Sequence, residues 1–226
     1  MQSKADRVYQ VLLARIRKGE YHFGRRFSAA ALARELGVSR QPVMAAVALL
    51  EAEGFMSVQP QVSCSIVKPT EPDVVDFFEL FAVLEGLLAR LAVERASPGD
   101  LPRLEAAERK LRATQVRGLL PLSYGTYARR FHAVIHNMAR TPKLKQRVES
   151  VWGLADFYIN TAHVEIAQTD IQQEHDERRF LVEAIGRQDN GIEEAMRAHI
   201  RRKLYRIGPG KNWSSLRGNS ADGGHL

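Results

Sequence analysis

The sequence has one cysteine and no long apolar run, and each absence excludes a class of protein. Among 226 residues only Cys64 is a cysteine, so the chain can form no internal disulfide and contains no C-x-x-C metal motif. No apolar stretch approaches the roughly 20 residues that span a bilayer, and the N-terminus lacks the apolar core of a signal peptide. We therefore expect a cytoplasmic protein, in which any metal would be held by His, Asp or Glu.

Motifs that carry catalytic chemistry are also missing. The sequence contains no G-x-S-x-G and no Walker loop, and it contains neither E-x-x-H nor H-E-x-x-H, which di-iron and zinc hydrolase sites use. Cys64 lies in a predicted strand and is a poor candidate for a nucleophile. We expect no enzyme activity, and a histidine-bound metalloenzyme is the alternative from a different class.

The positive charge is concentrated near the N-terminus. The net charge is +7 and the isoelectric point is about 9.7. Residues 1–70 contain ten Lys/Arg against five Asp/Glu, whereas residues 71–226 contain 23 against 21. An excess of positive charge in the first third of the chain favours a polyanionic partner such as DNA, because neutralised phosphates release counterions.

The first 70 residues predict three helices followed by a β-hairpin. Apolar residues recur at every fourth position within residues 3–18, as on one face of a helix. Ser28 and Ser39 are candidate N-caps of the second and third helices, which Gly37 and Gly54 end. Two short strands, at residues 55–58 and 63–67, then flank a turn. We expect a DNA-binding domain over residues 1–69.

The string LARELGVSRQPV, at residues 32–43, is the most specific motif in the chain. It combines a short helix, a glycine turn and a second helix with polar residues at its start, which is the arrangement of a helix-turn-helix. The first turn of the second helix would enter the major groove. There Arg40 could pair with guanine and Gln41 with adenine, while Ser39 could contact a phosphate.

This string, together with the following ALLEAEGF and the preceding VLLARIRKGEYHFGRRF, resembles the GntR family of bacterial regulators over nearly all of residues 6–68. The resemblance implies a winged helix-turn-helix and a dimer that reads a short inverted repeat in double-stranded DNA. Met44 and Ala45 stand where the family usually has arginine and glutamate, so the operator differs from the common one or is bound more weakly. The predicted DNA contacts are Arg34, Ser39, Arg40, Gln41, Met44 and Gln61.

The rest of the chain predicts a mainly α fold. Residues 70–206 show helical periodicity without strand alternation, and we expect about six helices in an antiparallel bundle that binds an effector and dimerises. A stripe of leucines in the first of these helices belongs either to the core or to a dimer interface. Arg178 and Arg179 are expected on a solvated face. Residues 207–226 are rich in Gly and Ser and predict a disordered tail.

Three histidines of the predicted bundle suggest a metal site. His132, His175 and His199 lie on three helices, and three converging imidazoles could hold Zn²⁺ or Ni²⁺ with positions left open. Their segments resemble the FCD effector domain of the FadR-like branch of the family, in which an aspartate completes a divalent-metal site. Ala128 stands at that place, so the fourth ligand is missing. The alternative is that each histidine is a hydrogen-bonded core residue.

The expected effector is a small molecule, and a carboxylate that completes the metal's coordination is the first candidate. Phe81 stands where the family tends to have an effector-binding arginine, and His136 lies one turn beyond His132. The predicted ligand pocket contains Phe81, Ala128 and His136. Since the aspartate and the arginine are both absent, a more apolar pocket, or a bundle that only dimerises, remains an alternative. The sequence does not decide between repression and activation.

Overall fold

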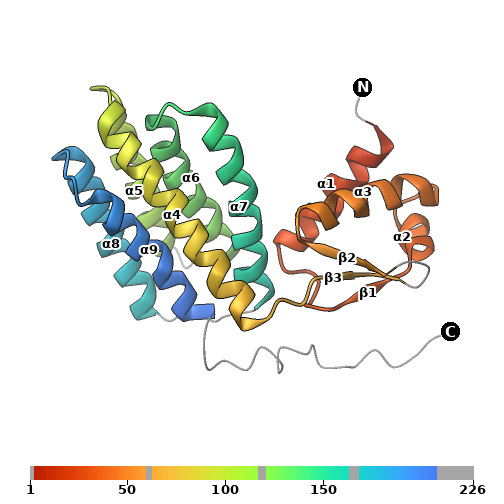
Figure 1. The fold of residues 1–226 in the computed structure, drawn as a ribbon. Helices are drawn as coiled ribbons and strands as arrows, with labels where there is room; N and C mark the ends of the chain where they lie inside the picture. Colours follow the sequence, from red (N-terminus) through yellow and green to blue (C-terminus); the bar gives the residue numbers. More distant parts are fainter. Residues whose placement is uncertain (1–2, 60–62, 117–120, 163–167, 208–226) are drawn as a thin grey trace. The chain divides into compact units, whose positions relative to one another are not determined.

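A computed structural model of the chain describes residues 3–59, 63–116, 121–162 and 168–207, and these form two compact units (Figure 1). The first unit contains the described residues up to Glu71 together with residues 153–162. The second contains residues 72–152 and 168–207. Residues 153–162, which the sequence analysis assigned to the helical domain, are thus part of the first unit.

The first unit combines three helices with a small antiparallel sheet. The helices are α1 (Lys4–Arg17), α2 (Ala29–Glu35) and α3 (Arg40–Ala52), and the strands are β1 (Arg26–Phe27), β2 (Met56–Gln59) and β3 (Ser63–Ile66). The strand order is β1-β3-β2. In the central strand, Cys64 pairs with Phe27 of β1 on one side and with Val58 of β2 on the other. The predicted hairpin is confirmed. Strand β1 was not predicted, because a strand of two residues is too short to show an alternation of apolar and polar residues.

Local signals explain where these helices begin and end. Ser3 forms a capping box at the start of α1, and the Ser28 hydroxyl accepts a hydrogen bond from the Ala31 amide at the start of α2. Gly37 has φ of 63°, a left-handed conformation that glycine adopts without strain, and it separates α2 from α3. Ser39 occupies the N-cap position of α3 as predicted, but its side chain makes no capping hydrogen bond.

The core of the first unit joins the helices to the wing. The Tyr9 hydroxyl on α1 donates to the carboxylate of Glu53 after α3, at 2.7 Å. Glu51 accepts from the Val58 amide of β2 at 2.8 Å, which ties α3 to the hairpin. Phe157, in the last part of α7, packs edge-on against Phe23 and Phe55. The core is made of Val8, Leu12, Leu13, Ile16, Leu32, Val43, Ala46, Val47, Leu50, Phe55 and Ile66.

The second unit contains helices and no strand within its described residues. Its helices are α4 (Glu71–Arg95), α5 (Asp100–Val116), α6 (Pro121–Met138), α7 (Pro142–Thr161), α8 (Gln168–Gly186) and α9 (Ile192–Ile207). Helix α5 packs against α6 and α8, and α8 packs against α9. The six helices agree with the predicted bundle, and proline starts both α6 and α7, where its missing amide hydrogen costs nothing. Helix α7 supplies residues to both units.

No helix within the described ranges is both long and apolar enough to cross a membrane. The tail that was predicted to be disordered lies outside the described residues from position 208 onward, and so does Gln61 in the wing turn.

Candidate functional site

Helix α3 has one buried face and one exposed face that is polar where the helix begins. Its residues Val43, Ala46, Val47 and Leu50 have no exposed surface, so they fix the helix against the core. The opposite face is exposed and carries Ser39, Arg40, Gln41, Met44, Ala45 and Ala48. An α-helix held in this way can enter the major groove with its first turn leading, as the second helix of a helix-turn-helix does.

The predicted DNA contacts that the structure describes all lie on the surface of the first unit. Arg34 is exposed on α2, and Ser39, Arg40 and Gln41 are exposed where α3 begins. The side chain of Met44 lies one turn further and is also exposed. The short turn at Gly37 brings α2 and α3 together, and the two helices pack against each other.

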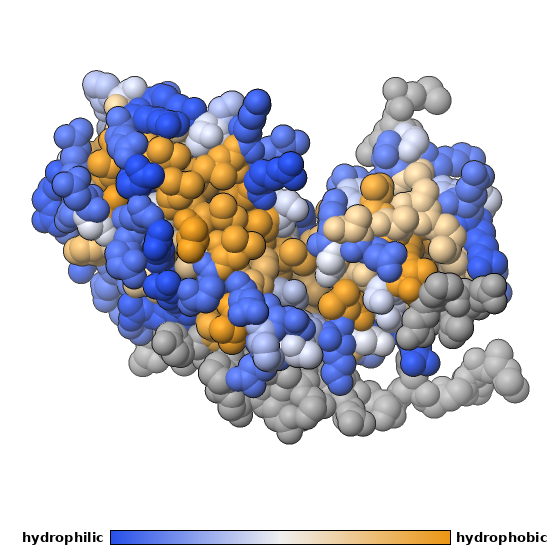
Figure 2. All heavy atoms as spheres, viewed as in Figure 1, coloured by the Kyte–Doolittle hydropathy of each residue, from blue (hydrophilic) through white to orange (hydrophobic). Residues whose placement is uncertain are grey.

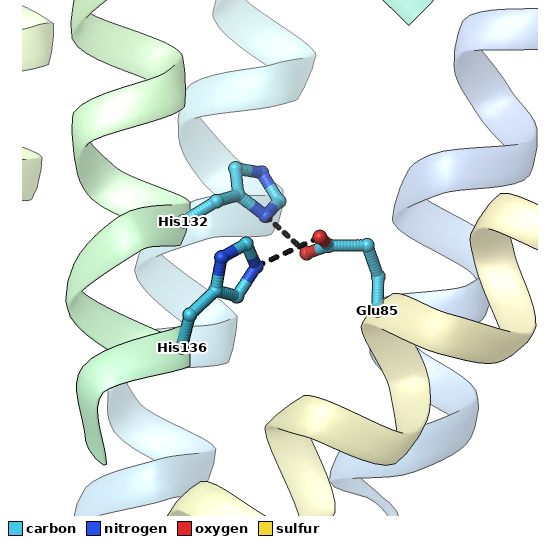
Figure 3. A group of neighbouring side chains, drawn as sticks. All are labelled: Glu85, His132 and His136. Atoms are coloured by element: carbon cyan, nitrogen blue, oxygen red, sulfur yellow. Dashed lines mark hydrogen bonds and ion pairs between the residues drawn. The ribbon is translucent and has the colours of Figure 1, made fainter. Parts of the chain in front are cut away.

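A buried cluster centred on Glu85 joins three helices of the second unit. Glu85 on α4 has no exposed surface. Its carboxylate accepts hydrogen bonds from His132 Nδ1 at 2.7 Å and from His136 Nε2 at 2.8 Å, both on α6 (Figure 3). It also accepts from Trp152 Nε1 on α7 at 2.7 Å. The two histidines are four residues apart and therefore lie on the same face of α6.

The electrostatics of this cluster keep Glu85 ionised and His132 neutral. Burial alone raises the pKa of Glu85, but its interactions with the rings of His136 and His132 outweigh burial and hold the pKa well below its usual range. Burial lowers the pKa of His132 to about 3, more than the Glu85 carboxylate raises it. His132 therefore carries its single ring proton on Nδ1, facing Glu85, and has a lone pair on Nε2.

His199 on α9 has the same protonation pattern as His132. Its Nδ1 lies 2.7 Å from the Glu177 carboxylate, and burial, followed by the charge of Lys203, lowers its pKa well below the ordinary value. The His199 ring stacks on that of His132, with 5.6 Å between the ring centroids. The Nε2 atoms of both rings are buried and have no hydrogen-bond partner among the described residues.

His175 on α8 differs, because its neighbour is a buried arginine. Arg178 Nη2 lies 3.0 Å from His175 Nδ1, and a guanidinium can only donate, so this nitrogen accepts. Burial and then the charge of Arg178 lower the pKa of His175 to about 4, and its ring proton is therefore on Nε2. Arg178 is completely buried and pairs with Glu174 at 2.9 Å. The prediction of a solvated Arg178 was wrong, whereas Arg179 is exposed.

The structure brings together a different set of potential metal ligands from the predicted one. Within the described parts of the chain, one set of three ligand atoms lies within 4.8 Å of one another, and it belongs to Glu85, His132 and His136. His175 and His199 are not part of that set, and the triad of His132, His175 and His199 stays a prediction. The sequence analysis singled out His136 but missed Glu85.

The two other predicted pocket residues are buried in the same unit. Phe81 has no exposed surface, and its ring meets the Trp152 ring edge-on at 5.1 Å between centroids. Ala128 is buried on α6, one turn before His132. The aromatic ring of Phe81 therefore occupies the space next to Trp152, which is itself hydrogen-bonded to Glu85.

The fold and the α3 surface define a winged helix-turn-helix DNA-binding protein with a helical second domain. Comparison with known proteins places it further: residues 4–66 match the sequence model "Bacterial regulatory proteins, gntR family" and residues 76–202 match the "FCD domain". The chain therefore belongs to the GntR family of transcription regulators with an FCD domain, which confirms both resemblances seen in the sequence.

Individual relatives agree with this family. The chain is 26% identical over 194 residues to the uncharacterized HTH-type transcriptional regulator YdhC of Bacillus subtilis, with 85% of each chain covered. It is 27% identical to the HTH-type transcriptional regulator McbR of Escherichia coli over 121 residues, 54% of each chain. Its fold resembles the solved structure of E. coli McbR/YncC, with a TM-score of 0.75 at 22% identity over 92% of this chain and 98% of that one.

The lowered histidine pKa values predict a loss of stability in mild acid. His132 and His199 are neutral in the folded protein but have an ordinary pKa of about 6.5 when unfolded. Below that pH the unfolded state binds more protons, so the free energy of unfolding should fall by about 1.4 kcal/mol per pH unit for each histidine between about pH 6 and 5. Denaturant titrations at several pH values measure this slope.

Two substitutions of histidine separate this effect from general acid sensitivity. His199→Gln should reduce the pH dependence of the free energy of unfolding by the contribution of one histidine, because glutamine takes up no proton on unfolding. His22→Gln, at an exposed position, is the matched control for the replacement of a histidine by glutamine. Equal slopes for the two variants would show that His199 is protonated in the folded protein.

Proposed function

We propose that this regulator is a cytoplasmic homodimer that binds an inverted-repeat operator through α3 and changes its DNA affinity when an effector binds the helical unit. The observation that carries the proposal is the two-faced α3, whose buried face is packed in the core while its exposed face carries Arg40 and Gln41. A symmetric dimer would present two such helices to half-sites about one helical turn apart.

Each exposed side chain of α3 has a role in the proposed complex. Arg40 reads guanine through its two parallel donors, and Gln41 reads adenine. Ser39 and Arg34 bind phosphates, since the Ser39 hydroxyl is not used as a helix cap. Met44 cannot donate a hydrogen bond and instead makes an apolar contact with the groove, for example with a thymine methyl group.

An apolar face of α4 supports dimerisation with a second copy of the chain. Leu80 and Val83 are 55% and 42% exposed, and Leu84, Leu87 and Leu91 are half-buried. Figure 2 shows apolar side chains gathered on the face of the second unit that carries α4. The leucines at positions 80, 84, 87 and 91 follow the 4-3-4 spacing with which two helices interlock. We therefore propose that this α4 apolar face pairs with its copy.

Helix α7 offers a route for the effector response. Its Trp152 donates to Glu85 in the second unit, and five residues later Phe157 packs with Phe23 and Phe55 of the first unit. An effector that changes the Glu85 cluster would alter the position of Trp152. Because the helix is continuous, the change would reach the packing beneath the DNA-binding elements. A divalent metal in the second unit is part of the proposal, with His132, His175 and His199 as its predicted ligands.

Loss of the Arg40 side chain should weaken specific DNA binding. For Arg40→Ala we expect a cost of about 1–3 kcal/mol on a duplex that the wild-type protein selects from a random library. Fluorescence anisotropy at one fixed salt concentration measures the affinity. The matched control is Arg109→Ala, which removes the same charge from an exposed position on α5. If both variants bind the selected duplex equally well, Arg40 does not contact bases.

A charge on the α4 apolar face should separate the dimer. Leu80→Glu places a carboxylate at an exposed position, so the fold of the subunit is preserved while an apolar contact across the interface is lost. Sedimentation velocity should then show a monomer at concentrations where the wild-type protein is a dimer. Phe180→Glu, at a 48% exposed position on α8, is the control and should remain dimeric. A dimeric Leu80→Glu protein would place the interface elsewhere.

A further inference from the structure

We propose that the outer face of the β-sheet in the first unit is a second DNA-binding surface, which binds the phosphate backbone of the operator that α3 reads. It consists of one row of residues, Arg26 on β1, Ser65 on β3 and Ser57 on β2, and we call this row the outer sheet face. None of these residues is among the DNA contacts predicted from the sequence. The inference rests on the proposed function, since it takes α3 as the element that reads the bases.

The strand register places the three side chains on one face of the sheet. The strands lie side by side in the order β1-β3-β2 (Figure 1), and Arg26 and Ser57 are each directly opposite Ser65. Residues opposite each other in an antiparallel pair point to the same face. Cys64 and Ile66 alternate with Ser65 along β3 and are buried in the core. Arg26 and Ser57 are exposed and Ser65 is half-buried, so the row faces away from the core.

The row carries hydrogen-bond donors and a positive charge but no carboxylate. A guanidinium binds a phosphate through two parallel donors, and serine hydroxyls are frequent phosphate ligands in protein–DNA complexes. These contacts need no particular base, because every nucleotide carries the same phosphate. The outer sheet face therefore fits the DNA backbone rather than the base edges.

The positive charge at this sheet has no carboxylate partner in the described part of the unit. Within residues 3–59 and 63–70, all ion pairs involve Arg15, so Arg26 and the exposed Lys68, two residues after β3, form none there. The acidic side chains of the same stretch interact with other groups: the capping box holds Asp6, Arg15 pairs with Glu20 and Glu35, the Val58 amide binds Glu51, and the Tyr9 hydroxyl binds Glu53. A polyanion is therefore the complementary partner of this sheet.

The outer sheet face is also close to the end of the wing hairpin. It lies two residue pairs from the pair formed by Gln59 and Ser63, which is about 7 Å at about 3.4 Å per residue. The minor groove of DNA is about 6 Å wide, so with the predicted contact Gln61 in that groove the row would face the phosphates along its border. Glu51 of α3 accepts from the Val58 amide at 2.8 Å and holds β2 at a fixed position relative to the helix that reads the bases.

The salt dependence of DNA binding by the full chain tests this surface. Fluorescence anisotropy measures binding to the selected duplex and to a scrambled duplex between about 0.05 and 0.2 M salt. For Arg26→Ala, the slope of log affinity against log salt concentration should become shallower by about 0.9, because one phosphate contact is lost. The affinity for both duplexes should fall about 8-fold at about 0.1 M salt. Arg26→Lys, which keeps the charge, and Arg109→Ala, exposed on α5, should keep the wild-type slope.

A second pair of variants tests the row at a different residue. Ser57→Asp and Ser57→Asn have nearly the same size and differ in charge, so the aspartate variant should bind both duplexes more weakly, most of all at low salt. Melting temperatures establish that each variant is folded. The proposal is overturned if Arg26→Ala keeps the wild-type slope, if it weakens binding to the selected duplex alone, or if the two Ser57 variants bind equally well. Arg40→Ala is measured in the same assay, so a failed outer sheet face leaves the reading of bases by α3 standing.

Discussion

The buried carboxylate of Glu85 is the constraint on which the helical unit depends. One side chain of α4 accepts hydrogen bonds from His132 and His136 on α6 and from Trp152 on α7, so three helices converge on a single charge. When one member of a buried charged network is removed, its partners stay buried without their hydrogen bonds, and each loses the compensation for its desolvation. The positions of these three helices are therefore coupled. The same charge sets the tautomer of His132, and through it the chemistry that any ligand would meet.

The DNA-binding unit and the helical unit use polar groups in opposite ways. On α3 the polar residues Arg40 and Gln41 are exposed and positioned by a wholly apolar face beneath them. In the second unit the polar residues are buried and position one another. Helix α7 contributes to both, through Trp152 and Phe157. One helix therefore carries contacts of both kinds.

Features encoded by neighbouring residues were predictable, and features that depend on distant pairs were not. The cap at Ser28 and the turn at Gly37 lie within a few positions of what they control, so the helix-turn-helix could be predicted. Helical periodicity within each segment likewise predicted the bundle of about six helices. Glu85 meets partners 47 and 51 residues away, and no local pattern in the sequence links residues so far apart. Arg178 was misjudged because its burial depends on the packing of the bundle around α8.

The most direct test of this account is the stability of Glu85→Gln compared with Glu79→Gln. Glutamine keeps the size of Glu85 but removes its charge and points a donor at histidines that also donate, so we expect a loss of about 3–5 kcal/mol in the free energy of unfolding. Glu79 on the same helix pairs with Arg201 at a 46% exposed position, where the loss should be about 0–1 kcal/mol. Equal losses in denaturant titrations of the two variants would contradict the central role of Glu85.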